Sequence, residues 1–360
     1  MNRKITVGFS IMISLIVASI VFTVTMVFST RWFSTSMSNV QEKEQMYKKI
    51  AEIEQLIRSQ YVGDLDDERL LDSISSGIMT GTGDPNSYYL TAADYRDYIQ
   101  EQEGKIGNIG IELEADVSGY MRVTTVYPGS PAQTAGLQSG DLITTVGGHP
   151  VTSLSVNQVG KRLKQPLNST IVVNYYRDSV EKSAEVLLKS YKKPTVFHRM
   201  MSPFGYIQIT EFTNTTEDDF TAAINDLIAQ GAVGLIYDIR NNPGGLMNAV
   251  AGCLDPLLPA GPIMRYVHKN GVITEPFFSS AKTLSLPTVV IINERTTSAA
   301  ELFAQVLRDH NKASVVGVPS QGKWTLQSMF KLEDGSAIHL TVATFSSPLS
   351  QSRAGVGVRP

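Results

Sequence analysis

Residues 286–301 read Leu-Pro-Thr-Val-Val-Ile-Ile-Asn-Glu-Arg-Thr-Thr-Ser-Ala-Ala-Glu, an apolar run followed by a short polar turn. The run is continuous rather than alternating, which is typical of a strand covered on both faces. Beyond the turn, apolar residues recur at helical spacing as far as His310. We therefore predict that Ser298 lies where a buried strand passes into a helix.

Two interpretations of Ser298 rest on the same residues. At such a junction, free backbone N–H groups and the positive end of the helix dipole can stabilise an oxyanion, which suits a nucleophilic serine. Ser298 with Glu301 three residues later also fits a capping box, which serves only the helix. The two roles are compatible, so the neighbouring motifs must decide between them.

Lys323 is a candidate partner for Ser298. It follows a second continuous apolar run, residues 313–318, and stands in Gln321-Gly-Lys-Trp324. A serine hydroxyl is a weak nucleophile until a base takes its proton, and a lysine can be that base if burial lowers its pKa towards neutrality. The sequence supplies the pair of residues but not the burial.

A glycine-rich turn follows a third apolar run, residues 232–236. The segment is Tyr237-Asp-Ile-Arg-Asn-Asn-Pro-Gly-Gly-Leu246. Asn-Pro-Gly-Gly predicts a turn, because proline fixes one dihedral angle and glycine accepts positive φ. Paired glycines also expose backbone N–H groups where a substrate carbonyl can approach closely.

Together these segments resemble the catalytic blocks of the carboxyl-terminal processing peptidases, also called tail-specific proteases. Order and spacing agree as well as composition, over residues 238–245, 298–301 and 322–327. Two positions depart from the family pattern: Ala300 replaces a second serine, and Gln-Gly-Lys-Trp replaces Phe-Gly-Lys-Gly. Neither change removes a proposed catalytic atom, although Trp324 places a large ring beside the proposed base, where it could help to dry Lys323 or alter the substrate channel.

The resemblance implies a role for each candidate residue. Ser298 is expected to be the nucleophile, Lys323 its general base and Gln327 the residue that orients the lysine. The oxyanion hole is expected from the backbone N–H of Ala299 and one N–H of the Gly244-Gly245 pair. No metal or organic cofactor is implied, and the five histidines are scattered without ligand spacing.

Residues 107 to about 189 resemble a PDZ domain. The series Gly-Ser-Pro-Ala, Ala-Gly-Leu and Gly-Asp-Leu-Ile occurs in the expected order between residues 129 and 143. Such a domain binds by strand addition, with backbone N–H groups around the C-terminal carboxylate of a peptide and an apolar pocket for its last side chain. The alternative is a small turn-rich β-domain without that activity. The expected carboxylate-binding loop comprises Gly107, Asn108, Ile109, Gly110 and Ile111.

Residues 5–28 carry no charge and are long enough to span a bilayer. A cleaved signal peptide has a shorter apolar region and a small-residue cleavage site, and a surface helix needs a charged face. Arg3 and Lys4 precede the run, which favours a cytoplasmic amino terminus and export of the rest. We predict a single-pass anchor with the catalytic region outside the cytoplasm, and a bacterial source.

Between this span and the PDZ region, helices are predicted. Residues 41–61 carry an apolar stripe of the kind that usually contacts a core; exposed, it would be a surface for forming a homodimer. Further helices are expected over residues 67–80 and from Thr91. Residues 83–90, Gly-Asp-Pro-Asn-Ser-Tyr-Tyr-Leu, resemble a motif of the family's N-terminal helical region.

The predicted fold class is multidomain α+β. A length of 360 residues with 42% hydrophobic content exceeds what one core usually serves, and a net charge of −3 gives no basic footprint for nucleic acid. The single cysteine, Cys253, excludes an intrachain disulfide and is expected to be a buried apolar residue. The resemblance implies that the protease core is crotonase-like (ClpP-like). The expected parts are a cytoplasmic N-terminus (1–4), a transmembrane helix (5–28), a linker and N-terminal helical region (29–103), a PDZ domain (104–190) and an α/β protease core (191–360).

The predicted function is a membrane-anchored, exported serine endopeptidase that recognises the accessible C-terminus of a protein or peptide. A Ser–His–Asp hydrolase is a weaker alternative, because His310 and Asp309 lie about 18 Å from Ser298 along one helix and His339 is expected in a strand. Another alternative is an inactive PDZ adaptor, favoured by Ala300 and Trp324. An esterase for small substrates leaves the PDZ domain unexplained.

Overall fold

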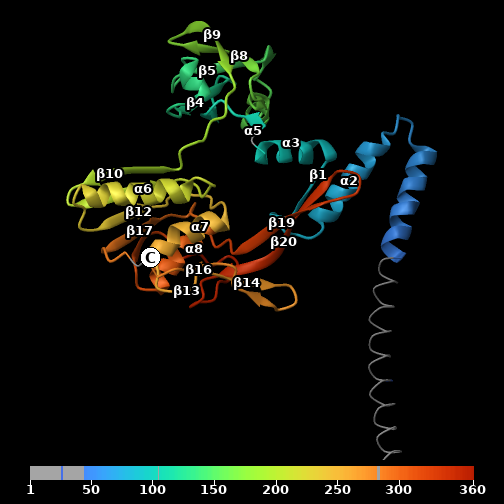
Figure 1. Ribbon diagram of the computed structural model, residues 1–360. Coiled ribbons are helices and arrows are strands. Elements are labelled where there is room, and N and C mark those ends of the chain that lie inside the picture. The colour runs from blue at the N-terminus through green and yellow to red at the C-terminus, as the bar shows by residue number, and fades with distance from the viewer. Residues whose placement is uncertain (1–25, 27–43, 104, 282–283) are drawn as a thin grey trace, which may run out of the picture. The chain divides into compact units, whose positions relative to one another are not determined.

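The computed structural model describes residue 26 and residues 44–103, 105–281 and 284–360 (Figure 1). The chain divides into two compact units, residues 1–73 and residues 74–360. Among the described residues, no helix combines the length and apolar character needed to cross a membrane. The predicted span, residues 5–28, lies outside the described residues except for Met26.

The first unit contains a helix over residues 44–60 and the start of α2 (Asp67–Thr80), whose bounds match the predicted helix. The predicted apolar stripe is present on residues 44–60, but the expectation that it contacts a core is wrong for most of it. Tyr47, Ile53 and Leu56 are 61%, 47% and 56% exposed. This helix therefore presents apolar side chains to solvent.

The PDZ region is built on a six-stranded antiparallel sheet in the order β3-β4-β5-β8-β9, with β6 paired to β5. Its largely alternating burial pattern leaves one face for the core, which runs from Ile109 to Leu188. Helix α5 (Val156–Leu163) carries a capping box at Ser155 and packs on this core through Val159 and Leu163. The remaining elements are α4 (Pro131–Thr134), β2 (Ile106–Gly107), β3 (Ile111–Ala115), β4 (Met121–Val126), β5 (Leu142–Val146), β6 (His149–Pro150), β7 (Gln165–Pro166), β8 (Thr170–Arg177) and β9 (Val180–Leu187).

The catalytic region contains a five-stranded sheet in the order β10-β11-β12-β17-β18. The first pair is antiparallel and the other three pairs are parallel. The carboxyl ends of β12, β17 and β18 therefore meet at one edge, and each predicted catalytic segment follows one of them. The strands are β10 (Val196–Met201), β11 (Phe204–Ile209), β12 (Leu235–Asp238), β17 (Thr288–Ile292) and β18 (Ser314–Gly317).

Helices α6 (Thr216–Ala229), α7 (Met247–Leu254), α8 (Ala299–Asp309) and the 3-10 turn η1 (Asp255–Leu257) accompany this sheet. Helix α8 is buried from Ala299 to Leu307, and its polar residues Glu301, Gln305 and Arg308 share one side. Phe303 of α8 packs against Phe212, Phe220 and Tyr237, with ring centroids 5.7–6.1 Å apart. The predicted burial of Cys253 on α7 is confirmed.

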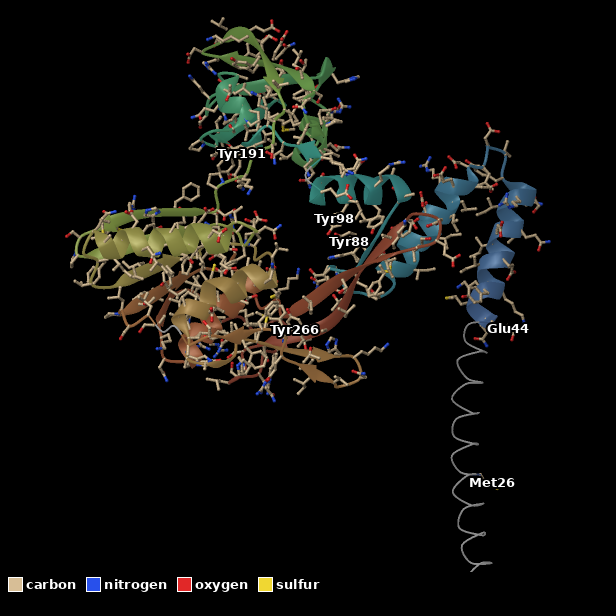
Figure 2. All side chains as sticks on the ribbon, in the orientation of Figure 1. Met26, Glu44, Tyr88, Tyr98, Tyr191 and Tyr266 are labelled. Carbon is tan, nitrogen blue, oxygen red and sulfur yellow. The ribbon has the colours of Figure 1, made fainter. Side chains whose placement is uncertain are left out.

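A second sheet of five strands follows the order β1-β20-β14-β15, with β19 also paired to β20. Strand β1 (Tyr88–Leu90) comes from the segment before the PDZ region, and Tyr88 is labelled in Figure 2. The ring centroid of Tyr88 lies 4.7 Å from that of His339 on β20. Helix α3 (Ala92–Gln102) follows β1 and starts at the predicted place, with Thr91 as its N-cap. The other strands of this sheet are β14 (Arg265–His268), β15 (Ile273–Thr274), β19 (Thr325–Lys331) and β20 (Ala337–Ser346). Strands β13 (Gly261–Pro262) and β16 (Phe278–Ser279) form a separate antiparallel pair.

Candidate active site

Ser298 stands at the predicted strand-to-helix junction, as the N-cap of α8. Its backbone has φ +57° and ψ −121°, a conformation that residues other than glycine rarely adopt. Nucleophiles on sharp turns between a strand and a helix carry this kind of strain, because the turn exposes the side chain. Ser298 is half-buried while the helix behind it is fully buried, so a reactive hydroxyl here has a rigid support.

The glycine turn lies directly against Ser298. A Cβ atom on Gly244 would stand 2.9 Å from Ser298 Cβ and 3.0 Å from the backbone nitrogen of Ala299. A Cβ on Gly245 would stand 2.1 Å from the Phe212 carbonyl oxygen, and both glycines have positive φ. Both positions therefore require glycine, and the two sequence motifs meet in space.

Asn242 ties this turn to its surroundings. Its side chain is fully buried, its Nδ2 donates to the Ile209 carbonyl, and its Oδ1 accepts from the Gly244 N–H at 2.8 Å. Its own carbonyl accepts from the Thr297 N–H at 3.0 Å, one residue before Ser298. The asparagine thus sets the distance between the glycine turn and the nucleophile turn.

These hydrogen bonds show which of the two glycines has a backbone N–H group free to bind an oxyanion. The Gly244 N–H is occupied by Asn242. In the part of the chain that the structure describes, the N–H groups of Gly245 and Ala299 have no hydrogen-bond partner. Two unpartnered N–H groups beside a serine hydroxyl can receive the negative charge of a tetrahedral intermediate. Gly245 is therefore the stronger candidate of the predicted pair.

Glu301 connects the nucleophile turn with the turn that carries Lys323. Its carboxylate is fully buried, and Oε2 accepts from the backbone N–H groups of Ser298 and Lys323, both at 2.8 Å. Oε1 accepts from the Gly322 N–H at 2.5 Å and from the Ser320 hydroxyl at 2.6 Å. Burial raises the pKa of Glu301, against the effect of these four hydrogen bonds. The capping role was predicted, whereas the bridge to Lys323 was missed.

Lys323 is half-buried and lies in the turn two residues before β19 begins. The neighbouring Trp324 is 3% exposed; its ring packs at 5.6 Å on Phe345, and its Nε1 donates to the Val356 carbonyl. The tryptophan of the unusual Gln-Gly-Lys-Trp stretch is therefore part of the core behind the lysine. This burial fixes the backbone next to Lys323.

Gln327 lies on β19, four residues after Lys323. Its Nε2 donates to the hydroxyls of Thr325 and Thr341, at 2.8 and 3.1 Å. Neither of these bonds involves Lys323, so the predicted contact between Gln327 and the lysine is not among them.

Asp238 and Arg240 stabilise the start of the glycine turn. Asp238 is 1% exposed and accepts from Arg240 Nη2 at 2.6 Å and from the Tyr206 hydroxyl at 2.7 Å. Burial alone would raise the pKa of Asp238, but these hydrogen bonds outweigh it and lower the pKa. The pair is an ionised structural brace for the turn.

The histidine alternative receives no support. His310 is the C-cap of α8, at the opposite end of the helix from Ser298. His339 lies in β20, as expected, where Nδ1 contacts the Asn86 carbonyl at 3.1 Å.

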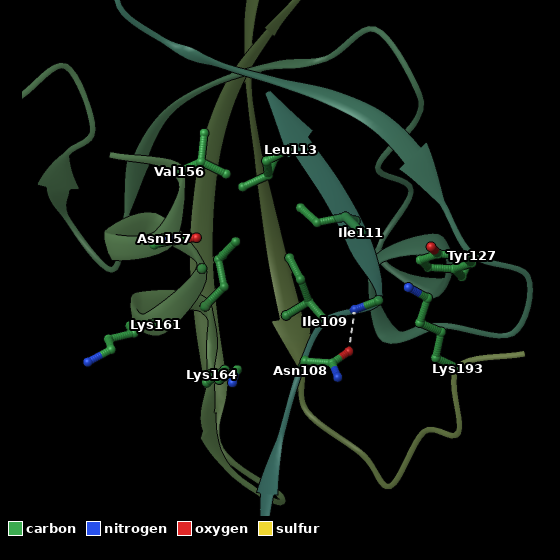
Figure 3. Close-up of a pocket in the computed structure, with 13 residues that line it drawn as sticks. Asn108, Ile109, Ile111, Leu113, Tyr127, Val156, Asn157, Lys161, Lys164 and Lys193 are labelled. Carbon is green, nitrogen blue, oxygen red and sulfur yellow. Dashed lines mark hydrogen bonds between the residues drawn. The ribbon is translucent and has the colours of Figure 1, made fainter. Parts of the chain in front are cut away.

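The PDZ groove is a separate cavity of about 560 Å³ between β3 and α5 (Figure 3). Ile111 and Leu113 of β3 lie across it from Val156 of α5. Of the five predicted loop residues, Asn108, Ile109, Gly110 and Ile111 line the groove, and Asn108 Oδ1 accepts from the Gly110 N–H at 2.9 Å. Gly107 is not among the groove residues; it pairs with Gln165 in β7 instead. The groove combines an apolar floor with a loop at one end.

Comparison with known protein families identifies both the PDZ region and the catalytic region. Residues 122–177 match the PDZ domain, and residues 203–360 match peptidase family S41. Residues 203–360 form an S41 peptidase domain. The resemblance seen in the sequence is confirmed, and this S41 peptidase is a serine hydrolase of the carboxyl-terminal processing type. That assignment argues against the adaptor and esterase alternatives.

Named relatives of the S41 peptidase agree. It is 28% identical over 335 residues to the carboxy-terminal-processing protease of Bartonella bacilliformis, covering 91% of this chain and 77% of that protein. It is 28% identical over 364 residues to the carboxy-terminal processing protease CtpA of Bacillus subtilis, covering 100% of this chain and 77% of that protein. Among solved structures, a photosystem II D1 C-terminal processing protease superposes with TM-score 0.56 at 25% identity, covering 83% of each chain.

Proposed function

We propose that this S41 peptidase is an endopeptidase that cleaves by an acyl-enzyme mechanism with Ser298 as nucleophile and Lys323 as base. Ser298 Oγ attacks the scissile carbonyl carbon and its proton passes to Lys323 Nζ. The carbonyl oxygen becomes an oxyanion facing the N–H groups of Ala299 and Gly245. The lysine then gives the proton to the departing amine, and water hydrolyses the ester that remains.

One observation carries this proposal: a strained, half-buried serine stands against a glycine turn, with two unpartnered N–H groups beside it. Glu301 supports Lys323 as the base. One oxygen of its carboxylate accepts hydrogen bonds from the backbone N–H groups of both Ser298 and Lys323, so it holds the two turns together. Gln327 would orient the lysine through its amide.

The PDZ groove is proposed to receive the C-terminal residue of the substrate, which adds a strand beside β3. Its apolar floor of Ile111, Leu113 and Val156 favours an apolar last side chain. Binding there would raise the concentration of the same chain near Ser298.

Location is proposed on the sequence, and assembly on the exposure of one apolar face. The uncharged run 5–28 and the basic residues before it favour a single-pass anchor with the catalytic region on the extracytoplasmic side of a bacterial membrane. The exposed apolar face of residues 44–60 suits contact with a second copy of the chain. The family resemblance also leads us to expect a crotonase-like (ClpP-like) core.

The test is hydrolysis of a denatured reporter protein with an apolar C-terminus by the full chain in detergent. Ser298→Ala and Lys323→Ala should each abolish cleavage and leave binding of a labelled C-terminal peptide unchanged. Glu294→Gln, an exposed change in the same turn, is the matched control. Cleavage that persists in Lys323→Ala would remove the lysine as base.

A further inference from the structure

Two consecutive strands and a turn that is distant in the sequence meet at Thr341 of β20. Gln327 of β19 is its cross-strand partner, and a β-bulge precedes this pair, because Leu326 pairs with Ala343 and leaves Val342 as an extra residue. Strand β1 pairs with β20 on its other side. The turn before β1 brings Asp84 to the Thr341 hydroxyl at 2.5 Å. Bulges often redirect a side chain beside an active site, and this one lies next to Gln327.

Asp84 acts only as a hydrogen-bond acceptor in this cluster. Besides Thr341, it accepts from the Ser87 hydroxyl at 2.6 Å and from the Asn86 N–H at 2.9 Å. Burial alone would raise the pKa of Asp84, but these hydrogen bonds lower it to about 2. Among the described residues, hydrogen bonds from uncharged groups lower the pKa of Asp84, and no charged side chain is among these causes. At neutral pH the side chain is a carboxylate without a proton to donate.

This carboxylate fixes the direction of the next hydrogen bond. A threonine hydroxyl has one proton, and that of Thr341 is directed at Asp84. Towards Gln327 the Thr341 oxygen can therefore only accept, so the amide must present its NH₂ group, at 3.1 Å. The second proton of the same NH₂ group goes to Thr325 at 2.8 Å. The amide oxygen, Oε1, is left facing away from both threonines.

The polarity of this amide matters for a neutral lysine, which has one lone pair and two protons on Nζ. An amide oxygen accepts one of those protons and leaves the lone pair free for the serine proton. An amide NH₂ in the same place would instead donate to the lone pair and compete with the serine. Only one of the two amide orientations is compatible with a lysine base.

We propose that Asp84 and Thr341 are positioning residues that hold the Gln327 amide with Oε1 available to Lys323. The proposal rests on the proposed function, in which Lys323 is the base. It gives the Gly-Asp-Pro-Asn-Ser turn, residues 83–87, a role in catalysis from a position far outside the segment that matches family S41.

Thr341→Val tests the proposal, since valine keeps the shape of threonine and removes the hydroxyl. We expect kcat to fall about tenfold or more with KM nearly unchanged, and Thr341→Ser to restore most of the rate. The acid limb of the kcat/KM profile should move to lower pH by about one unit, because the protonated lysine loses an acceptor. Thr344→Val, at an exposed position of the same strand, is the control and should match wild type.

Asp84→Asn is the second variant. Asparagine can donate to Thr341 and so permits the reversed amide, and we expect the same fall in kcat and the same shift of the acid limb. Binding of a C-terminal peptide should stay close to wild type in both variants, and Thr341→Val should unfold near the wild-type temperature, which separates this effect from misfolding. Asp84→Asn loses the stabilising carboxylate, so it should unfold at a lower temperature.

The outcomes distinguish the two proposals. Retained cleavage in Lys323→Ala would refute the proposed function itself. Loss of cleavage in Lys323→Ala together with wild-type kcat and an unmoved acid limb in Thr341→Val would refute only the orientation of Gln327. Equal loss in Thr341→Val and Thr341→Ser, with a lowered melting temperature, would reduce Thr341 to a structural part of β20 and would also overturn the inference.

Discussion

Replacing Glu301 by glutamine tests whether one buried carboxylate joins the nucleophile turn to the base turn. The native carboxylate accepts four hydrogen bonds, two at each oxygen. Glutamine has one oxygen, so its NH₂ group must face one of the two pairs of donors. Facing Ser298 and Lys323, it would meet two backbone N–H groups that cannot turn away.

The less costly arrangement places the NH₂ group towards Ser320 and Gly322. The Ser320 hydroxyl can rotate and accept, whereas the Gly322 N–H is left buried and unpaired. One such group costs about 1–3 kcal/mol, so we expect the free energy of unfolding to fall by about that amount. The bonds to Ser298 and Lys323 persist but lose their ionic partner, and we expect kcat to fall about tenfold.

Chemical denaturation measures the stability, and hydrolysis of a peptide measures kcat. Glu301→Ala leaves all the donors unpaired, so it should lose more in both assays than Glu301→Gln. Glu294→Gln, in the same turn but exposed, should change neither. If Glu301→Gln kept wild-type stability and kcat, the bridging role of the carboxylate would be wrong.

Three further predictions follow from the same geometry. Gly244→Ala puts a Cβ 2.9 Å from that of Ser298 at φ +98°, so hydrolysis should fall at least a hundredfold while peptide binding survives; normal kcat would contradict the contact. Because the pKa of Asp84 is lowered from 3.8 to about 2, its stabilising contribution is present above pH 4 and is lost as the pH falls towards 2. Wild-type stability should therefore fall more steeply than that of Asp84→Asn over this interval in denaturation at pH 5, 3 and 2, and equal slopes would count against it. Val156→Asp places a negative charge in the PDZ groove and should weaken binding of a C-terminal peptide about tenfold by fluorescence anisotropy, whereas exposed Thr152→Asp should bind normally.

Local patterns predicted the elements that hold the candidate site. The apolar runs 286–292 and 313–318 contain strands β17 and β18, and the residues at helical spacing after Ser298 form helix α8. Parallel strands bring their carboxyl ends to one edge, so the approach of the glycine turn to Ser298 follows from topology. The choice of Gly245 over Gly244 does not, because it depends on where the side chain of Asn242 points.

Long-range hydrogen bonds were beyond the sequence patterns. Glu301 was predicted as a cap because its partner Ser298 is three residues away, but its bonds to Gly322 and Lys323 join separate loops. Asp84 and Thr341 are 257 positions apart, and no periodicity or turn signal relates them. The apolar stripe on residues 44–60 shows a related limit, since a pattern defines an apolar face but not whether another surface covers it.

The pairing of β1 with β20 bears on how much of this chain is needed to make an enzyme. Residues 203–360 contain every proposed reacting group, yet the sheet that carries Gln327 is completed by a strand from residues 88–90. A fragment cut at the family boundary would leave one side of β20 bare, with the main-chain polar groups of residues 337–339 open to solvent or to a foreign strand. Such a fragment should be prone to aggregate, and a protease that nicks the chain near residue 90 would inactivate the enzyme without touching its catalytic residues.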